Sequence, residues 1–249
     1  MQNTFFRFEF KYPVPYSLIP SIESDFMNMG FEKDSPSLLD GFYYVSSIYF
    51  DTPTLSDYSD KAGGFLNRKK VRARIYGQEI QQINPDSPTI WLEIKEKHDM
   101  MIHKRRVAIT PAEWAGLLES RNFAYDKILS RLKNPEDSIF SEFVYLIACE
   151  TRKPYVVVQY KRRAMHYYSE KKPVRVTLDY DIRAEKNSSF CKTPSEDVSH
   201  DMAIIELKFK EALPWPVKFV IEKYNLRRDA YSKYAKSVDA VRRLYPISR

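Results

Sequence analysis

Eight segments of the chain alternate apolar and polar residues with a period of two, which is the pattern of a half-buried β-strand. In the segment KKVRARIY, Lys70, Arg72 and Arg74 fall on one face, whereas a valine, an alanine and an isoleucine fall on the other. The predicted strands span residues 5–12, 43–50, 69–76, 89–97, 103–110, 154–168, 173–182 and 203–210.

Helical patterns lie between these strands. Thr110 and Glu113 form a capping-box sequence with Pro111 at the first helical position, which predicts a helix to about residue 120. Further helices are predicted over residues 16–29, 124–151 (two short helices broken at Asn134-Pro135), 214–224 and 228–244, and loops over 77–88 and 184–201. No internal repeat or linker is visible, so we expect one α+β domain over residues 1–249.

Each predicted strand has one apolar face and one charged face. The charged faces carry mainly Arg and Lys with isolated Glu or Asp, and almost no Ser, Asn or Gln. An antiparallel sheet with one face on helices and the other in water would explain any single strand. For the whole set, a barrel with the charged face inward is the alternative. Its cations would surround an open tunnel, and an anion such as phosphate, whose oxygens match the Arg fork, would have to neutralise them.

The overall charge supports an anionic partner. The 249 residues carry a net charge of +7, which favours nucleotides, polyphosphates, nucleic acid or membrane surfaces without choosing among them. Two cysteines are too few for a disulfide framework or a zinc site. The first residues lack an apolar signal core and no apolar run is long enough to span a membrane, so we expect a cytoplasmic protein. The four histidines are scattered, and we expect none of them to be catalytic.

The sequence resembles the vacuolar transporter chaperone (VTC) domain, the polyphosphate polymerase branch of the triphosphate tunnel metalloenzymes. The resemblance covers almost the entire chain. Ten short motifs carry it in order: FRFEFKY, SSIYFDT, KKVRARIY, WLEIKEK, HKRRV, YKRRA, VRVTLD, IIELKFK, LPWPV and YSKY.

This resemblance implies an eight-stranded antiparallel β-barrel with a charged interior and helices packed on the outside. It implies transfer of the γ-phosphate of ATP to a growing inorganic polyphosphate chain, with Mn2+ or Mg2+ as cofactor. The implied catalytic residues are Lys11, Arg72, Arg74, Lys95, Arg162 and Arg175. The implied phosphate-binding residues are Lys104, Arg106, Tyr160, Lys208, Ser232 and Lys233. The implied metal ligands are Glu206 and Glu9. Tyr49 and Asp51 are expected to shape a strand end rather than to contact substrate.

Two departures from the family pattern bear on the function. Hydrolytic relatives often begin with a Glu-x-Glu-x-Lys motif, and here Arg7 replaces the first Glu, leaving Glu9. This favours the polymerase branch. Eukaryotic polymerases of this kind also carry a phosphate-sensing domain and associate with membrane helices; neither is found in this sequence, so we expect a soluble, stand-alone enzyme.

Two alternatives remain open at this point. One is a metal-dependent triphosphate or polyphosphate hydrolase that uses the same tunnel with water as acceptor. The other is a non-enzymatic binder of polyphosphate or nucleic acid. We expect no nucleic-acid partner, because RNA-reading sheets carry aromatic platforms on the binding face, and the aromatic residues of the first strand lie opposite its charges.

Overall fold

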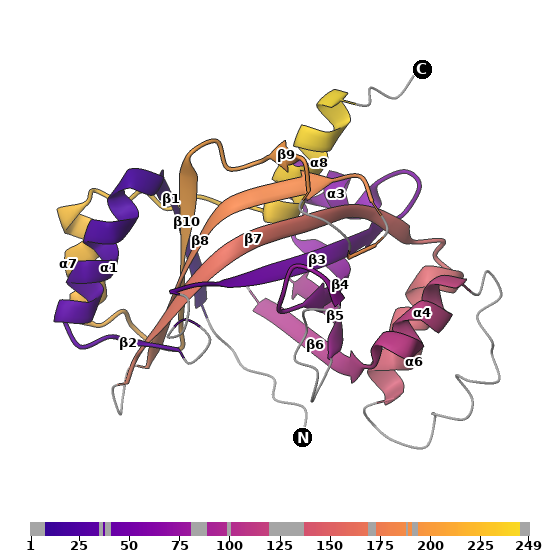
Figure 1. Ribbon diagram of the computed structural model, residues 1–249, viewed down its shortest axis with the longest axis horizontal. Coiled ribbons are helices and arrows are strands. Elements are labelled where there is room, and N and C mark those ends of the chain that lie inside the picture. The colour runs from indigo at the N-terminus through magenta and orange to yellow at the C-terminus, as the bar shows by residue number, and fades with distance from the viewer. Residues whose placement is uncertain are drawn as a thin grey trace.

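A single, strongly curved antiparallel sheet forms the body of the protein (Figure 1). The computed structural model describes residues 8–34, 37, 41–80, 89–98, 101–119, 137–168, 173–187, 189, 190 and 194–244. The main strands follow the order β1-β10-β8-β7-β3-β4-β5-β6. Their bounds are β1 Phe8–Pro15, β3 Tyr43–Asp51, β4 Asn67–Ile75, β5 Ile90–His98, β6 Met101–Ile109, β7 Lys153–Tyr167, β8 Val174–Glu185 and β10 Met202–Phe209.

All eight strands predicted from the alternating pattern are confirmed to within a few residues. Two short strands that were not predicted, β2 (Glu32–Lys33) and β9 (Glu196–Asp197), pair with β7 and β8. The helices are α1 Ile19–Asn28 (after the 3-10 turn η1 Tyr16–Leu18), α3 Ser56–Ala62, α4 Pro111–Glu119, α6 Asp137–Ala148, α7 Trp215–Lys223 and α8 Lys233–Leu244. Helix α3 was not predicted, and α8 begins five residues later than expected. Arg7 and the expected helical and loop segments over 120–136 and 81–88 lie outside the described residues.

The start of α4 illustrates how local sequence fixes a helix end. The backbone N–H of Thr110 donates to Glu113 Oε2 at 2.8 Å, and the backbone N–H of Glu113 donates to Thr110 Oγ1 at 3.3 Å. This reciprocal pair confirms the predicted capping box. Among the described residues, no helix is both long enough and apolar enough to cross a membrane.

The expected closure into a barrel is not confirmed, because the sheet stays open among the described residues. In the described part of the chain, β1 and β6 are the two ends of the strand order and do not pair with each other. Register shifts between Tyr49 and Phe50, and between Gln159 and Lys161, bend the sheet without closing it. A closed eight-stranded barrel has an interior just wide enough for side chains. The concave face here carries long Arg and Lys side chains together with part of a helix. These groups need a wider interior than a closed eight-stranded barrel provides.

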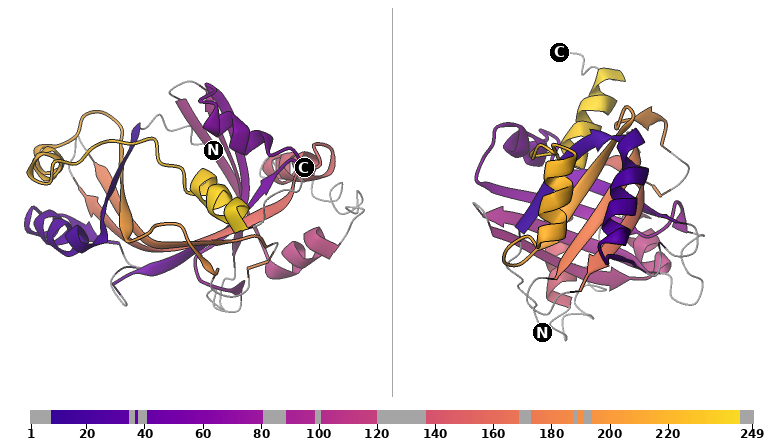
Figure 2. Two further views of the ribbon diagram at one scale, coloured as in Figure 1. Left: turned by 90° about the horizontal axis from the view of Figure 1, so that it is seen from above. Right: turned by 90° about the vertical axis from the view of Figure 1, so that its left-hand side faces the viewer.

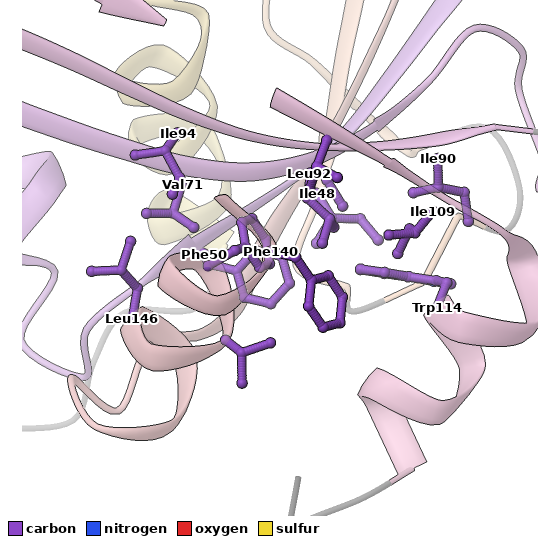
Figure 3. Packing of buried hydrophobic residues seen from close by; sticks show 14 of the residues in the cluster. Ile48, Phe50, Val71, Ile90, Leu92, Ile94, Ile109, Trp114, Phe140 and Leu146 are labelled. Carbon is purple, nitrogen blue, oxygen red and sulfur yellow. The ribbon is translucent and has the colours of Figure 1, made fainter. Parts of the chain in front are cut away.

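The convex face of the sheet is apolar and is covered by two pairs of helices. The β3–β6 half packs against α4 and α6, where Phe50 and Trp114 meet edge to face with ring centroids 6.3 Å apart (Figure 3). The half formed by β1, β10 and β8 packs against α1 and α7 (Figure 2). Val71, Ala73 and Ile75 are fully buried in the first of these cores. The predicted inversion, with apolar residues outward and charged residues inward, is therefore confirmed for this strand.

Helix α8 is an exception to the expectation that all helices lie outside. It rests within the curve of the sheet (Figure 2). Its Tyr234, Val238 and Val241 are buried in a third core with residues of β3, β7 and β8, among them Tyr49 and Tyr160. The concave face is thus divided: α8 fills one part with apolar side chains, and the charged residues line the remainder.

Candidate functional site

An inner cavity of about 100 Å³ lies on the concave face beside the start of α8. Its lining contains nine Lys or Arg side chains and two carboxylates, supplied by strands from both ends of the sheet and by α8. Glu9 of β1 and Lys95 of β5 approach each other to 3.2 Å, so an ion pair spans the side on which the strands do not pair. The residues that line the inner cavity are Glu9, Lys11, Tyr49, Lys70, Arg72, Arg74, Lys95, Ile102, Lys104, Tyr160, Arg162, Glu206, Lys208, Ser232, Lys233 and Tyr234.

Glu93 gathers three of these cations at one wall. Its carboxylate is 1% exposed, and Oε2 accepts from Nε of Arg72 at 2.6 Å and lies 3.9 Å from Nε of Arg74. Lys104 forms an ion pair with the other carboxylate oxygen. Burial alone would raise the pKa of Glu93, but Arg72, Arg74 and Lys104 more than offset it and hold the pKa well below its usual range. Glu93 is therefore an ionised, internal counter-anion.

The amine of Lys104 changes its protonation state close to neutral pH. Burial lowers the pKa of Lys104 to about 6; Glu93 opposes this shift, and Arg72 and Arg74 reinforce it. An anion placed beside this amine would favour its ammonium form. A bound phosphate would therefore favour protonation of Lys104 and so gain a further positive charge in the cavity.

Asp179 plays the corresponding part at the opposite wall. Arg162 donates to both of its oxygens, at 2.6 and 2.7 Å, and Lys233 Nζ lies 2.6 Å from Oδ2. Arg162 also donates to the hydroxyl of Tyr160 at 3.2 Å. Burial raises the pKa of Asp179, but Arg162 and Lys233 outweigh it and bring the pKa to about 2. Because the carboxylate fixes both cations, their free N–H groups are held in place toward the cavity.

Two carboxylates enter the cavity from the neighbouring strands β1 and β10. In the strand register Glu9 faces Lys208 and Lys11 faces Glu206, so the two Glu residues lie diagonally across one pair of strands. Glu9 contacts Lys11 and Lys95, and Glu206 contacts Lys208 at 2.9 Å. Burial raises the pKa of both carboxyls, and the surrounding cations overcome this and hold both ionised, with Glu9 at about 2.

These two carboxylates are suited to a divalent cation shared with substrate. The described residues contain no cluster of three or more His, Cys, Asp or Glu side chains that could enclose a metal unaided. Magnesium sites at phosphate-transfer centres typically use one or two carboxylates, with substrate phosphate oxygens and water completing the octahedron. Glu9 and Glu206 provide such a donor set, beside the cations that would hold the phosphates.

The start of α8 is anchored both to the cavity and to the sheet. Lys70 Nζ donates to Ser232 Oγ at 2.8 Å, and Lys11 Nζ donates to the carbonyl oxygen of Tyr231 at 3.0 Å. Tyr234 donates to the carboxylate of Asp51 at the end of β3. Asp51 also accepts from the backbone N–H groups at the start of α3, so it shapes this strand end, as the sequence predicted.

The VTC domain family model matches residues 6–242. The chain belongs to the VTC domain family. No curated protein matches it.

Similar solved structures include two putative adenylate cyclases. The one from Bacillus halodurans has a TM-score of 0.48 at 11% identity, with 92% of this chain and 94% of that chain covered. The one from Vibrio parahaemolyticus has a TM-score of 0.48 at 12% identity, with 96% and 100% covered. A protein of Pyrococcus horikoshii has a TM-score of 0.46 at 12% identity, with 94% and 99% covered.

Most of the residues that the family resemblance suggested come together in this VTC domain. Two of them do not line the cavity. Arg106 is exposed and stacks on Trp91, with its guanidinium carbon 4.0 Å from the ring centroid. Arg175 donates to Asp34 at 3.1 Å outside the cavity. The twelve that do line it are Glu9, Lys11, Arg72, Arg74, Lys95, Lys104, Tyr160, Arg162, Glu206, Lys208, Ser232 and Lys233.

Sequence reasoning missed several residues that line the cavity or hold its cations in place. Tyr49 was expected only to shape a strand end, but it lines the cavity and accepts from Arg72 at 2.9 Å. Lys70 shares the face of Arg72 and could have been chosen on strand parity alone. Glu93 and Asp179 share their strand faces with cations too, but nothing in the sequence distinguishes a buried counter-anion from a surface carboxylate.

Proposed function

We propose that this VTC domain is an ATP-dependent polyphosphate polymerase. It transfers the γ-phosphate of ATP to the end of an inorganic polyphosphate chain and releases ADP. The observation that carries this proposal is the inner cavity, with nine cationic side chains and two ionised carboxylates in its lining. Such a lining strongly favours a multiply charged anion. Phosphate suits it best, because the planar guanidinium of Arg donates to two phosphate oxygens at once and the ammonium of Lys pairs with them as a compact charge.

The transfer step balances without a proton donor or acceptor from the protein. A terminal phosphate oxygen of the chain attacks the γ-phosphorus of ATP, a new P–O bond forms, and the bond to the bridging β,γ-oxygen breaks. The attacking oxygen is already anionic, so no general base is needed. This agrees with the described cavity lining, which includes no histidine.

Positioning and charge stabilisation supply most of the catalysis in phosphoryl transfer. Glu93 holds Arg72, Arg74 and Lys104 together at one wall, and Asp179 holds Arg162 and Lys233 at the other. Cations fixed in this way need little reorganisation as charge shifts from the transferred group to ADP. Glu9 and Glu206 would hold a Mn2+ or Mg2+ ion, which would neutralise phosphate charge and polarise the transferred group.

Product analysis tests the proposal. The purified chain is incubated with ATP and Mn2+, and the products are resolved by gel electrophoresis and phosphorus NMR. A polyphosphate ladder together with ADP supports the polymerase. Release of inorganic phosphate alone overturns it in favour of a hydrolase with water as acceptor, and binding without turnover indicates a polyphosphate binder.

A further inference from the structure

The side chain of Asp51, at the end of β3, is fully buried, with an exposed fraction of 0%. Its Oδ1 accepts from the backbone N–H groups of Thr52 and Asp57 at 2.7 and 3.0 Å. Its Oδ2 accepts from the backbone N–H of Tyr58 at 3.1 Å and from the hydroxyl of Tyr234. A buried carboxylate is tolerated only where donors satisfy it in this way. One side chain therefore connects the end of β3, the start of α3 and the first turn of α8.

The turn between β3 and α3 holds Asp51 in this position. The hydroxyl oxygen of Thr52 accepts from the backbone N–H of Ser56 at 3.0 Å, which closes the turn. Leu55 has φ 56° and ψ 49°, a left-handed conformation that is unfavourable for a bulky side chain. Its side chain is 5% exposed and packs in the same core as Tyr234. An unfavourable backbone conformation that packing maintains is a frequent feature of functional sites.

Tyr234 of α8 is fixed at both its ring and its hydroxyl. The ring stacks on Tyr49 of β3, with centroids 4.9 Å apart and an angle of 26° between the planes. The hydroxyl donates to Asp51, two residues further along the same strand. Tyr234 is only 1% exposed, so it has little room for another position. These two contacts determine how the first turn of α8 is rotated about the helix axis.

The same turn of α8 carries two residues of the inner cavity. Ser232 and Lys233 both line it, and Nζ of Lys233 lies 2.6 Å from Oδ2 of Asp179. Lys233 and Tyr234 are neighbours within one helical turn. A rotation that took the Tyr234 hydroxyl away from Asp51 would therefore also draw Lys233 away from Asp179.

We propose that Asp51 is a positioning residue for the phosphate site. Through the hydroxyl of Tyr234 it fixes the start of α8, and with it Ser232 and Lys233, in the arrangement that binds phosphate. Asp51 itself does not belong to the cavity lining. The choice of phosphate as ligand rests on the proposed function, whereas the role of Asp51 is tested by binding alone.

A second hydrogen bond between α3 and α8 provides a comparison. The hydroxyl of Tyr58 donates to Asp239 at 2.6 Å, and neither residue belongs to the cavity lining. This bond joins the same two helices further along α8. We expect it to contribute to stability without affecting the phosphate site.

The test changes each partner on the full chain and measures tripolyphosphate affinity by calorimetry. Tyr234→Phe removes one hydroxyl and keeps the ring that stacks on Tyr49. Asp51→Asn replaces one accepting oxygen with an NH2 group, so two donors lose their acceptor. We expect each variant to bind tripolyphosphate roughly fivefold more weakly, the factor that corresponds to one ordinary hydrogen bond. Because Asp51 acts through Tyr234, the double variant should lose little more affinity than either single variant.

Tyr58→Phe is the matched control, since it removes a hydroxyl from the same pair of helices outside the cavity. It should lower stability in urea, as Tyr234→Phe does, but change tripolyphosphate affinity less than about twofold. Phosphorus NMR adds a signature of the site itself. The resonances of bound tripolyphosphate should shift in Asp51→Asn and Tyr234→Phe and should stay in place in Tyr58→Phe.

Three results would overturn the proposal. Reduced stability with unchanged affinity in Asp51→Asn and Tyr234→Phe would show that Asp51 serves the fold only. Equal weakening of binding by Tyr58→Phe would show that any loosening of α8 has this effect. Losses that multiply in the double variant would show that Asp51 does not act through Tyr234. If Asp51→Asn fails to fold, the comparison of Tyr234→Phe with Tyr58→Phe still decides. If binding behaves as expected but no polyphosphate is made, only the proposed function fails.

Discussion

Arg72 and Glu93 form a two-pronged ion pair in which Nε and Nη2 of the arginine each lie 2.6 Å from Oε2 of the carboxylate. Arg74 and Lys104 complete the surroundings of this carboxylate, which is almost fully buried. The protein therefore carries an internal anion that holds two arginines and the amine of Lys104 together before any substrate arrives. A phosphate ligand adds to this arrangement rather than creating it.

Replacing Glu93 should destabilise the empty protein. In Glu93→Gln the two arginines lose their counter-charge, and removal of one partner from a buried ion pair costs about 3 kcal/mol of unfolding free energy. Urea unfolding measures the loss, which should be smaller with tripolyphosphate present because the ligand supplies negative charge. Glu96→Gln is the control: Glu96 lies on the opposite face of the same strand in more exposed pairs, so the cost should stay below about 1 kcal/mol. Equal stability of Glu93→Gln and the wild type would contradict this account.

The cavity arginines should matter more than the arginine outside it. Arg72→Ala together with Arg74→Ala removes charged donors from the wall where phosphates are proposed to bind. Turnover of ATP to polyphosphate should fall on the order of 10²- to 10³-fold, the usual loss when a transition-state donor is removed. Arg106→Ala should change turnover less than about threefold, because Arg106 stacks on Trp91 outside the cavity. Steady-state kinetics measures turnover of the double variant and of Arg106→Ala, and circular dichroism checks that each is folded. A comparable loss of turnover in both would place Arg106 in the site.

The alternating pattern predicted the strands well because each strand buries one face, and burial imposes a strict period of two. In KKVRARIY the pattern also distinguished the face of the strand that packs on helices from the face that lines the cavity, since Val71 and Ala73 pack in the helix-covered core. The pattern could not predict whether the sheet closes. Closure depends on bulges such as the one beside Gln159 and on what fills the concave face, and neither leaves a periodic signal.

The position of α8 was equally hidden from the sequence. Its apolar positions predict an amphipathic helix but not the surface that it covers. The structure places Tyr234 against Tyr49 with ring centroids 4.9 Å apart, which brings Ser232 and Lys233 to the cavity. Only the family resemblance had suggested these two residues. The counter-anions Glu93 and Asp179 were missed because strand parity shows the face of a carboxylate but not its burial.

Removal of a carboxylate from the cavity should weaken metal binding. Glu206→Gln keeps the shape of the side chain and removes a charge that would attract Mn2+ beside bound phosphates. In the presence of tripolyphosphate, Mn2+ affinity measured by electron paramagnetic resonance should fall about tenfold or more. Glu96→Gln, outside the cavity, should leave it unchanged. If Glu206→Gln binds Mn2+ as the wild type does, the metal is held elsewhere.

Phosphate binding should be coupled to proton uptake. In the empty protein the pKa of Lys104 is about 6, so the amine is mostly neutral at pH 7.5. A bound phosphate favours the ammonium form and raises this pKa, so the complex takes up a proton. Affinity for tripolyphosphate should therefore rise as the pH falls from 8 toward 6. Below about pH 6 the contribution from Lys104 should level off, because its amine is then already protonated in the free protein.

Calorimetry in buffers of different ionisation enthalpy counts these protons directly. Lys104→Gln should bind more weakly near pH 6 and should take up fewer protons at pH 7.5. Lys208, whose pKa burial lowers to about 8, should supply the uptake that remains at higher pH. Tripolyphosphate itself titrates near neutral pH, so its own protonation is subtracted by comparing the variant with the wild type under identical conditions. Identical proton uptake in the two proteins would show that Lys104 is already charged in the empty cavity, and that Glu93 rather than burial controls its charge.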